Sequence, residues 1–89
     1  MENINVGSNY VIHTVTHYYV GTVAKVFPLS VVLVNASWIA DTGRATAFYA
    51  DVSNASEIEV FPPDMEVTIY SGAIVVHYPA LGKLPSKQK

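Results

Sequence analysis

The chain is built from short runs of β-branched residues separated by glycine and proline, and no stretch keeps a helical spacing of apolar residues over three turns. Valine, isoleucine and threonine supply 26 of its 89 residues, and six tyrosines and three phenylalanines add to them. These residue types favour pleated, half-buried strands. The sequence therefore predicts one mainly β domain.

Glycine and proline divide these runs into five or six expected strands. Gly21 permits a sharp bend between the first two runs. Pro28 makes a short turn before an apolar strand. A short helix over 44–50, capped by Thr42, is expected in an insertion at 42–52. The expected strands are residues 10–20, 21–27, 31–36, 57–60, 65–70 and 73–78. Such short strands, with one bend, predict a small closed or nearly closed barrel.

The chain has more apolar surface than a monomer of its size can hide. A domain this short buries only about 60 to 65% of the surface that its unfolded form exposes. Yet 51% of its residues are hydrophobic and 13% are charged, about half the usual charged share. We therefore expect part of the apolar surface to be buried between subunits of a homo-oligomer.

Charge is unevenly placed along the chain. Residues 1–82, the expected domain, carry two basic and seven acidic side chains, a net charge of 2 − 7 = −5, whereas the basic tail 83–89 carries three lysines. We expect this tail to be flexible unless a neighbouring subunit captures it. An acidic body argues against broad binding to nucleic-acid phosphates, although a small electropositive pocket inside a ring stays open.

Several site classes and locations are disfavoured by what the sequence lacks. Cysteine is absent, which excludes disulfides and thiolate zinc sites. The first residues do not resemble a secretory signal, and the longest apolar run, residues 31–34, is too short to span a bilayer. We expect no membrane association and a cytoplasmic location.

Two segments together resemble the motifs of the Sm-like family. Residues 18–26 and 31–36, joined by a turn, resemble the first Sm motif, in which a glycine opens a bent strand. Residues 67–76 resemble the second, in which a glycine lies between two apolar strands. The resemblance implies a five-stranded, strongly bent open barrel of the SH3 type. It further implies that the fourth and fifth strands pair between subunits, giving a homo-oligomeric ring of about five to eight copies.

The resemblance does not carry over the family's uridine site. Sm-like proteins usually hold uridine with an Asp and an Asn in the first turn and an Arg before the second glycine. Here the first turn is Phe27 to Ser30, and Ser71 precedes Gly72. Weak binding to uridine-rich RNA is therefore expected, although Phe27 is able to stack on any base.

Three further segments resemble short phage proteins, including Sm-like rings of cyanophage origin. They are residues 14–19, 37–44 and 84–89. The resemblance implies a phage protein, acting in the host cytoplasm, that binds RNA or sequesters a nucleotide signal used in host defence.

The candidate ligand or RNA-binding residues lie in two turns and beside the expected helix. They are Phe27, Pro28, Leu29, Ser30, Trp38, Asp41, Arg44, Ser71 and Gly72. Asp41 and Arg44 either form an ion pair that fixes their turn or leave Arg44 to hold a phosphate. Trp38 is either a core or interface anchor or a platform for a base.

No group of residues predicts catalysis or a cofactor. His13 and His17 would lie about 13 Å apart on one strand, too far to share a metal ion, and no nucleophile elbow or phosphate loop is present. The sequence thus predicts a non-enzymatic Sm-like ring that binds RNA or a nucleotide. Two alternatives stay open: a sponge for a nucleotide immune signal, and a structural ring that docks a protein.

Overall fold

The computed structural model describes residues 3–89 as a mainly β fold with one short α-helix. The elements are β1 (Asn9–Thr14), β2 (Tyr18–Phe27), β3 (Ser30–Asp41), α1 (Ala45–Ala50), η1 (Val52–Asn54), β4 (Glu57–Val60), β5 (Val67–Tyr70), η2 (Ser71–Ala73) and β6 (Ile74–Pro79). The predicted β class and the helix in the 42–52 insertion are confirmed. The six strands are one more than the Sm-like resemblance implies.

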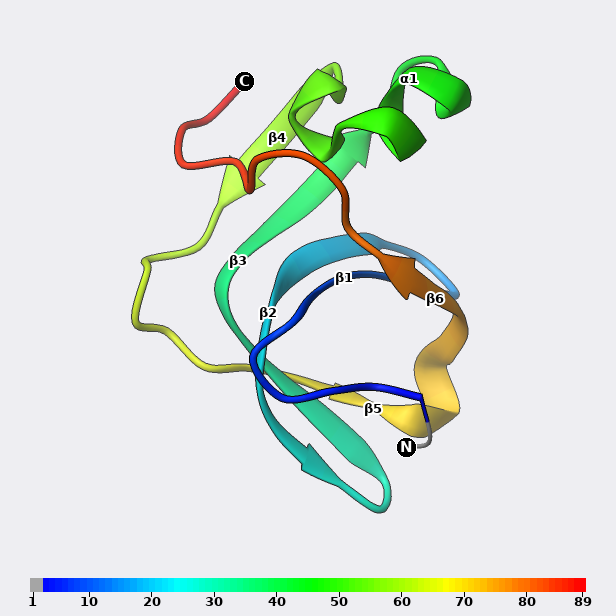
Figure 1. The fold of residues 1–89 in the computed structure, drawn as a ribbon, viewed down its shortest axis with the longest axis vertical. Helices are drawn as coiled ribbons and strands as arrows, with labels where there is room; N and C mark the ends of the chain where they lie inside the picture. Colours follow the sequence, from blue (N-terminus) through cyan, green and yellow to red (C-terminus); the bar gives the residue numbers. More distant parts are fainter. Residues whose placement is uncertain (1–2) are drawn as a thin grey trace.

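All strands pair antiparallel in one sheet that does not close. Its order is β4-β3-β2-β1-β6, and β5 pairs with β3 beside β4. β3 therefore carries two partners on one edge: β5 along Ser30–Leu33 and β4 along Ser37–Asp41. The chain passes from β5 through η2 to β6, at the other end of the sheet order, so that the sheet wraps around its interior (Figure 1).

The wrapping depends on a bend shared by β2 and β3. The register between these strands shifts between Val20 and Thr22, at Gly21. Opposite this shift, Asn35 adopts a left-handed backbone conformation with φ of 50°, which asparagine tolerates better than most residues. Gly21 was expected to separate two strands. It instead lies inside β2, because the bulge bends the strand without ending its pairing with β3.

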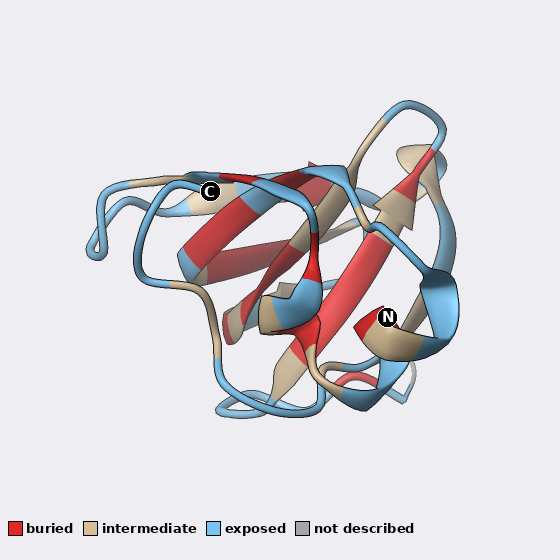
Figure 2. Cartoon of the chain, turned by 90° about the horizontal axis from the view of Figure 1, so that it is seen from above, coloured by how far each residue is buried: buried red, intermediate tan, exposed pale blue. Residues whose placement is uncertain are grey.

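Each face of the bent sheet carries a cluster of buried residues, and buried residues lie along the strands (Figure 2). The inner cluster consists of Ile4, Tyr10, Ile12, Val23, Val31, Leu33, Ala36 and Ile69. The outer cluster consists of Val11, Val20, Ile39, Phe48, Val52, Ala55 and Ile58. Phe48 of α1 and Val52 of η1 belong to the outer cluster, so the insertion covers the back of the sheet. Part of the apolar excess is thus buried inside the single chain.

Two strand boundaries differ from those expected. The run 10–20 is divided into β1 and β2 by a turn at 15–17, in which the amide and the hydroxyl of Thr14 both donate to the carbonyl of His17. The strand expected over 31–36 continues to Asp41, because β4 gives its second half a partner.

The helix cap also differs from the prediction. Arg44, and not Thr42, is the N-cap of α1, and the Arg44 side chain makes no capping hydrogen bond within residues 3–89. The Thr42 hydroxyl donates instead to the carbonyl of Gly43.

Residues 83–89 run back along β4 (Figure 1). The amide of Ile58 donates to the carbonyl of Lys89 over 2.8 Å, and the amide of Lys89 donates to the carbonyl of Ile58 over 3.0 Å. Leu84 packs against the outer cluster. Within residues 3–89 no helix is long and apolar enough to cross a membrane.

Candidate functional site

Six of the predicted site residues lie together where two turns meet. The β2–β3 turn supplies four of them and η2 supplies the other two. The amide of Ser71 donates to the carbonyl of Leu29 over 2.9 Å, and the adjacent strands pair Ser30 with Tyr70. The residues of this group, named here the turn cluster, are Phe27, Pro28, Leu29, Ser30, Ser71 and Gly72.

The turn cluster presents an apolar surface with little net charge. Leu29 is 73% exposed and Phe27 is 48% exposed, and the neighbouring Tyr70 is 68% exposed. The charged pair nearest in sequence is Lys25 and Glu66, whose Nζ and Oε2 atoms lie 3.1 Å apart. The two charges of this pair cancel. The turn cluster itself has no charged side chain, and a ligand would meet aromatic and aliphatic side chains and serine hydroxyls.

Trp38 lies in the second half of β3, away from the turn cluster. Its ring centroid is 4.9 Å from that of His17, and its main chain pairs with Tyr19 of β2. Tyr19 in turn stacks on Phe61 at 6.4 Å. The structure therefore gathers Trp38 into a row of rings with His17, Tyr19 and Phe61. The sequence did not reveal this row, because its members come from three separate segments, around residues 17–19, 38 and 61.

Asp41 and Arg44 flank the turn that leads into α1. The Asp41 carboxylate accepts a 2.8 Å hydrogen bond from the amide of Gly43. The Arg44 carbonyl accepts from the amide of Phe48, while its side chain is exposed. Across the described part of the chain, the one ion pair is Lys25–Glu66. Of the two alternatives for these residues, the Asp41–Arg44 ion pair is therefore not formed, and Asp41 fixes the turn through an amide.

Trp38 and α1 lie on opposite faces of β3. Ile39 packs with Phe48 of α1 in the outer cluster, and side chains of successive strand residues point to opposite faces. Trp38 therefore points away from the helix that Arg44 precedes. The nine predicted residues thus form two groups at opposite ends of β3, and the group containing Trp38 and Arg44 is itself divided by the sheet.

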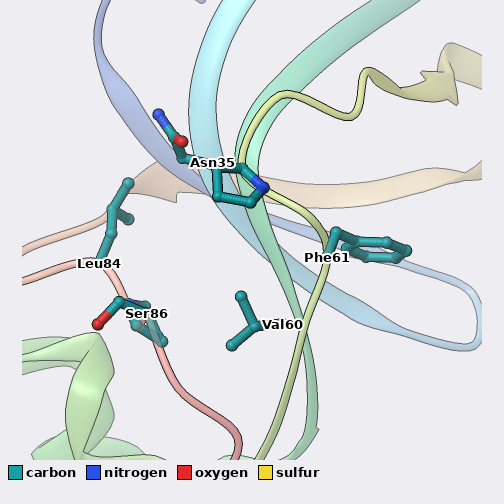
Figure 3. Close-up of a pocket in the computed structure, with 7 residues that line it drawn as sticks. Asn35, Val60, Phe61, Leu84 and Ser86 are labelled. Atoms are coloured by element: carbon teal, nitrogen blue, oxygen red, sulfur yellow. The ribbon is translucent and has the colours of Figure 1, made fainter.

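The sequence gave no indication of a pocket between the β4–β5 connection and the C-terminal segment. It has a volume of about 290 Å³ and is partly open to solvent. Figure 3 shows Leu84 and Ser86 on one side of it and Val60 and Phe61 on the other. Its lining residues are Asn35, Val60, Phe61, Pro63, Leu84, Pro85 and Ser86. The amide of Asn35 donates to the carbonyl of Pro63 over 3.0 Å, which holds the connection across β3. The walls are mainly apolar, and the folded-back segment 83–89 supplies three of the seven lining residues.

A second apolar surface lies where α1 meets the edge strand β6. Tyr49 and Tyr78 pack edge to face at 5.6 Å, and Val76 lies beside them in the same hollow. Burial raises the pKa of Tyr78 to about 12, with smaller contributions from Tyr49 and Tyr18. Val76 and Val75 are 46% and 59% exposed. Because these two residues are adjacent in β6, their side chains point to opposite faces, and each face exposes an apolar side chain.

The three histidines occupy separate environments. His13 of β1 stacks on Tyr18 at 3.9 Å, His17 lies in the turn after β1, and His77 of β6 meets Tyr10 edge to face. His13 and His17 are thus not on one strand as expected. Among residues 3–89 no three His, Cys, Asp or Glu side chains are grouped in a way that would hold a metal ion.

Comparison with known proteins adds no identity to this geometry. The chain matches no protein-family model, and neither a curated protein nor a solved structure is significantly similar to it.

Proposed function

We propose that the chain is a non-enzymatic, Sm-like subunit of phage origin that forms a homo-oligomeric ring in the host cytoplasm and binds RNA or a nucleotide at the turn cluster. The observation that carries the proposal is the hydrogen bond from Ser71 to Leu29. It joins the turns of the two segments that resemble the Sm motifs, so that one surface contains both.

The strand edges favour assembly. Of the described strands, β5 pairs only with β3 and β6 pairs only with β1. Each strand therefore leaves one edge without a strand partner, and such edges are templates for pairing with another chain. Pairing β5 of one copy with β6 of the next is a head-to-tail contact, which closes into a ring when the rotation between copies allows it. Tyr70, Val75 and Val76 would be covered in this contact.

The chemistry of the turn cluster favours stacking over charge recognition. Phe27 offers a half-exposed ring, and Ser30 and Ser71 offer hydroxyl groups. Lys25 is engaged with Glu66, so little positive charge is free to attract phosphates. A single site of this kind binds weakly and with low base selectivity. A ring repeats the site around its axis, and simultaneous contacts raise the overall affinity for a long strand.

Native mass spectrometry of the gently purified chain tests assembly and ligand together. We expect one closed oligomer that carries an oligonucleotide. A stable monomer would contradict the ring. A co-purifying mononucleotide would instead favour the sponge that the sequence left open.

The turn cluster is tested separately with Phe27→Ala and fluorescence anisotropy on uridine-rich RNA. The parent chain should bind this RNA weakly. Removing the aromatic side chain of Phe27 should make the binding free energy less favourable by about 1–3 kcal/mol. Met65→Ala is the matched control, because Met65 is similarly exposed (47%) and lies outside the turn cluster. Equal affinities of Phe27→Ala and the parent would move the RNA site elsewhere.

A structural ring that docks a protein is the second candidate. It is favoured by the exposed apolar side chains of Leu29, Phe27 and Tyr70, which lie together without a charged group. Surfaces of this kind are typical of protein contacts. An empty ring in the mass spectrum, together with no RNA binding, would select this function.

A further inference from the structure

The edge of β4 that faces away from β3 is occupied by the chain's own C-terminal segment. Ile58 and Lys89 exchange two main-chain hydrogen bonds of 2.8 and 3.0 Å. The amide of Val60 donates to the Gln88 side-chain oxygen over 2.9 Å. This is the pattern by which a peptide adds a strand to an open sheet edge. The β4 edge is therefore a strand-binding site, and its occupant is known.

The segment is held by few side chains. Leu84 and Pro85 are half-buried, whereas Lys83 and residues 86–89 are exposed. Its Lys89 ammonium donates to the carbonyl of Ser53 over 3.2 Å. The three lysines of the segment are opposite in charge to the exposed Glu57 and Glu59 of β4, although none of them forms an ion pair within residues 3–89. The segment is therefore held mainly by hydrogen bonds to the main chain, and it is not enclosed.

A single glycine sets the path by which the segment reaches β4. Gly82 has a φ of 80°, and a Cβ on it would overlap the carboxyl group of Asp51. On either side of it, the Leu81 carbonyl accepts from the amide of Val52, and the Lys83 amide donates to the Asp51 carboxylate. The turn at Gly82 thus directs residues 83–89 back onto their own β4.

We propose that the β4 edge is an exchange site, at which residues 83–89 of a second copy replace the chain's own, and that the turn at Gly82 holds the segment within its own copy. The segment of a second copy has the same amides, carbonyls and lysines, so exchange preserves every contact at β4 and changes only the path at Gly82. Such exchange of an identical element joins protomers at low cost, and it is sensitive to the hinge. The β5 and β6 edges used by the proposed ring take no part in it.

Cysteine trapping tests the exchange in the full chain, which has no cysteine of its own. Ile58 and Lys89 form a hydrogen-bonded pair, so Glu59 and Gln88 are the adjacent facing positions, at the spacing of a non-hydrogen-bonded pair. One copy carries Glu59→Cys and an affinity tag, and the other carries Gln88→Cys without a tag. The two are mixed and oxidised, and tagged-to-untagged dimers are counted on a non-reducing gel.

The hinge is tested by adding Gly82→Ala to both copies. Alanine at positive φ strains the turn and meets Asp51, so the expected result is about five- to thirtyfold more linked dimer than with Gly82. Gly72→Ala is the matched control, because a Cβ there meets open space, and it should leave the yield unchanged. Thr68→Cys replaces Glu59→Cys as the background control, because Thr68 is exposed on β5.

Amide hydrogen–deuterium exchange at Ile58 and Val60 distinguishes a swap of the C-terminal segment between copies from simple release of the segment from β4. If the segment of a second copy replaces the first, both amides stay protected in Gly82→Ala. A Gly82→Ala chain whose two amides lose protection, or whose linked dimer stays at the Thr68→Cys background, would overturn the proposal. Circular dichroism melting verifies that each variant is folded, and a chain with both Glu59→Cys and Gln88→Cys at high dilution should close on itself and so verify the facing positions.

Discussion

Gly21 in β2 packs so closely on β3 that a Cβ at this position would lie 3.1 Å from the carbonyl oxygen of Val34. The next nearest atoms belong to Ala36, at 3.2 and 3.3 Å. Since two of these three contacts are with main chain, the bent pair of strands must move to accept a side chain. We expect Gly21→Ala to lower the free energy of unfolding by about 1–3 kcal/mol in urea denaturation. Gly72→Ala, in open space, should change it little, and equal stability of the two variants would contradict the close packing.

The hydrogen bond from the Ser71 amide to the Leu29 carbonyl, which joins the two turns, can be tested by substitution at Ser71. Ser71→Pro removes the amide that donates to Leu29, while the preceding Tyr70, with φ of −84° and ψ of 140°, already has the backbone conformation that a following proline requires. Loss of this bond should cost about 0.5–1.5 kcal/mol of unfolding free energy. Ser71→Ala keeps the amide and is the control. A Ser71→Ala chain as unstable as Ser71→Pro would assign the effect to the hydroxyl.

Ser37 is fully buried, and its hydroxyl has no hydrogen-bond partner among residues 3–89. Ser37→Ala removes an unsatisfied polar group, so stability in urea should stay the same or rise by about 1 kcal/mol. Thr14→Ala is the contrasting variant, since the Thr14 hydroxyl bonds the carbonyl and amide of His17. It should be destabilised. A clear loss of stability in Ser37→Ala would reveal a partner for its hydroxyl.

Asp51 makes the fold sensitive to acid. Hydrogen bonds from the Ser53 hydroxyl and amide, and from the Lys83 amide, hold the pKa of Asp51 below its ordinary value of 3.8. The folded pKa lies below the unfolded one, so this contribution to stability is complete above about pH 4 and is lost as pH falls through the folded pKa. Asp51→Asn keeps an oxygen acceptor without titrating. Urea denaturation below about pH 4 should therefore show a smaller loss of stability in Asp51→Asn than in the parent, and equal losses would contradict the assignment.

The sequence predicted the elements whose ends are marked by local chemistry. The strand at Glu57–Val60 alternates between apolar and acidic residues, and the turn at Pro28 separates β2 from β3, as expected. The division of the run 10–20 was missed. Thr14 and the residues that follow it favour strands, and only the bonds between Thr14 and His17 make a turn there.

The candidate site was predictable only where neighbouring strands bring its parts together. The two turns resembling the Sm motifs meet because β5 pairs with the start of β3. Trp38 and Arg44 are near in sequence, and strand alternation nevertheless separates them across the sheet. The position of the tail also depends on a distant partner, since its hydrogen bonds go to β4 and its turn closes on Asp51.

The pairing of β1 with β6 has a consequence for the order in which the chain folds. β1, β2 and β3 are consecutive, and their pairing closes only short loops. β1 and β6 are far apart in sequence, and their pairing closes a loop that contains most of the chain. Closing so long a loop costs more entropy than closing a hairpin. The β1–β3 meander is therefore expected to form first, and the arrival of β6 to be the late, slow step that completes the inner core.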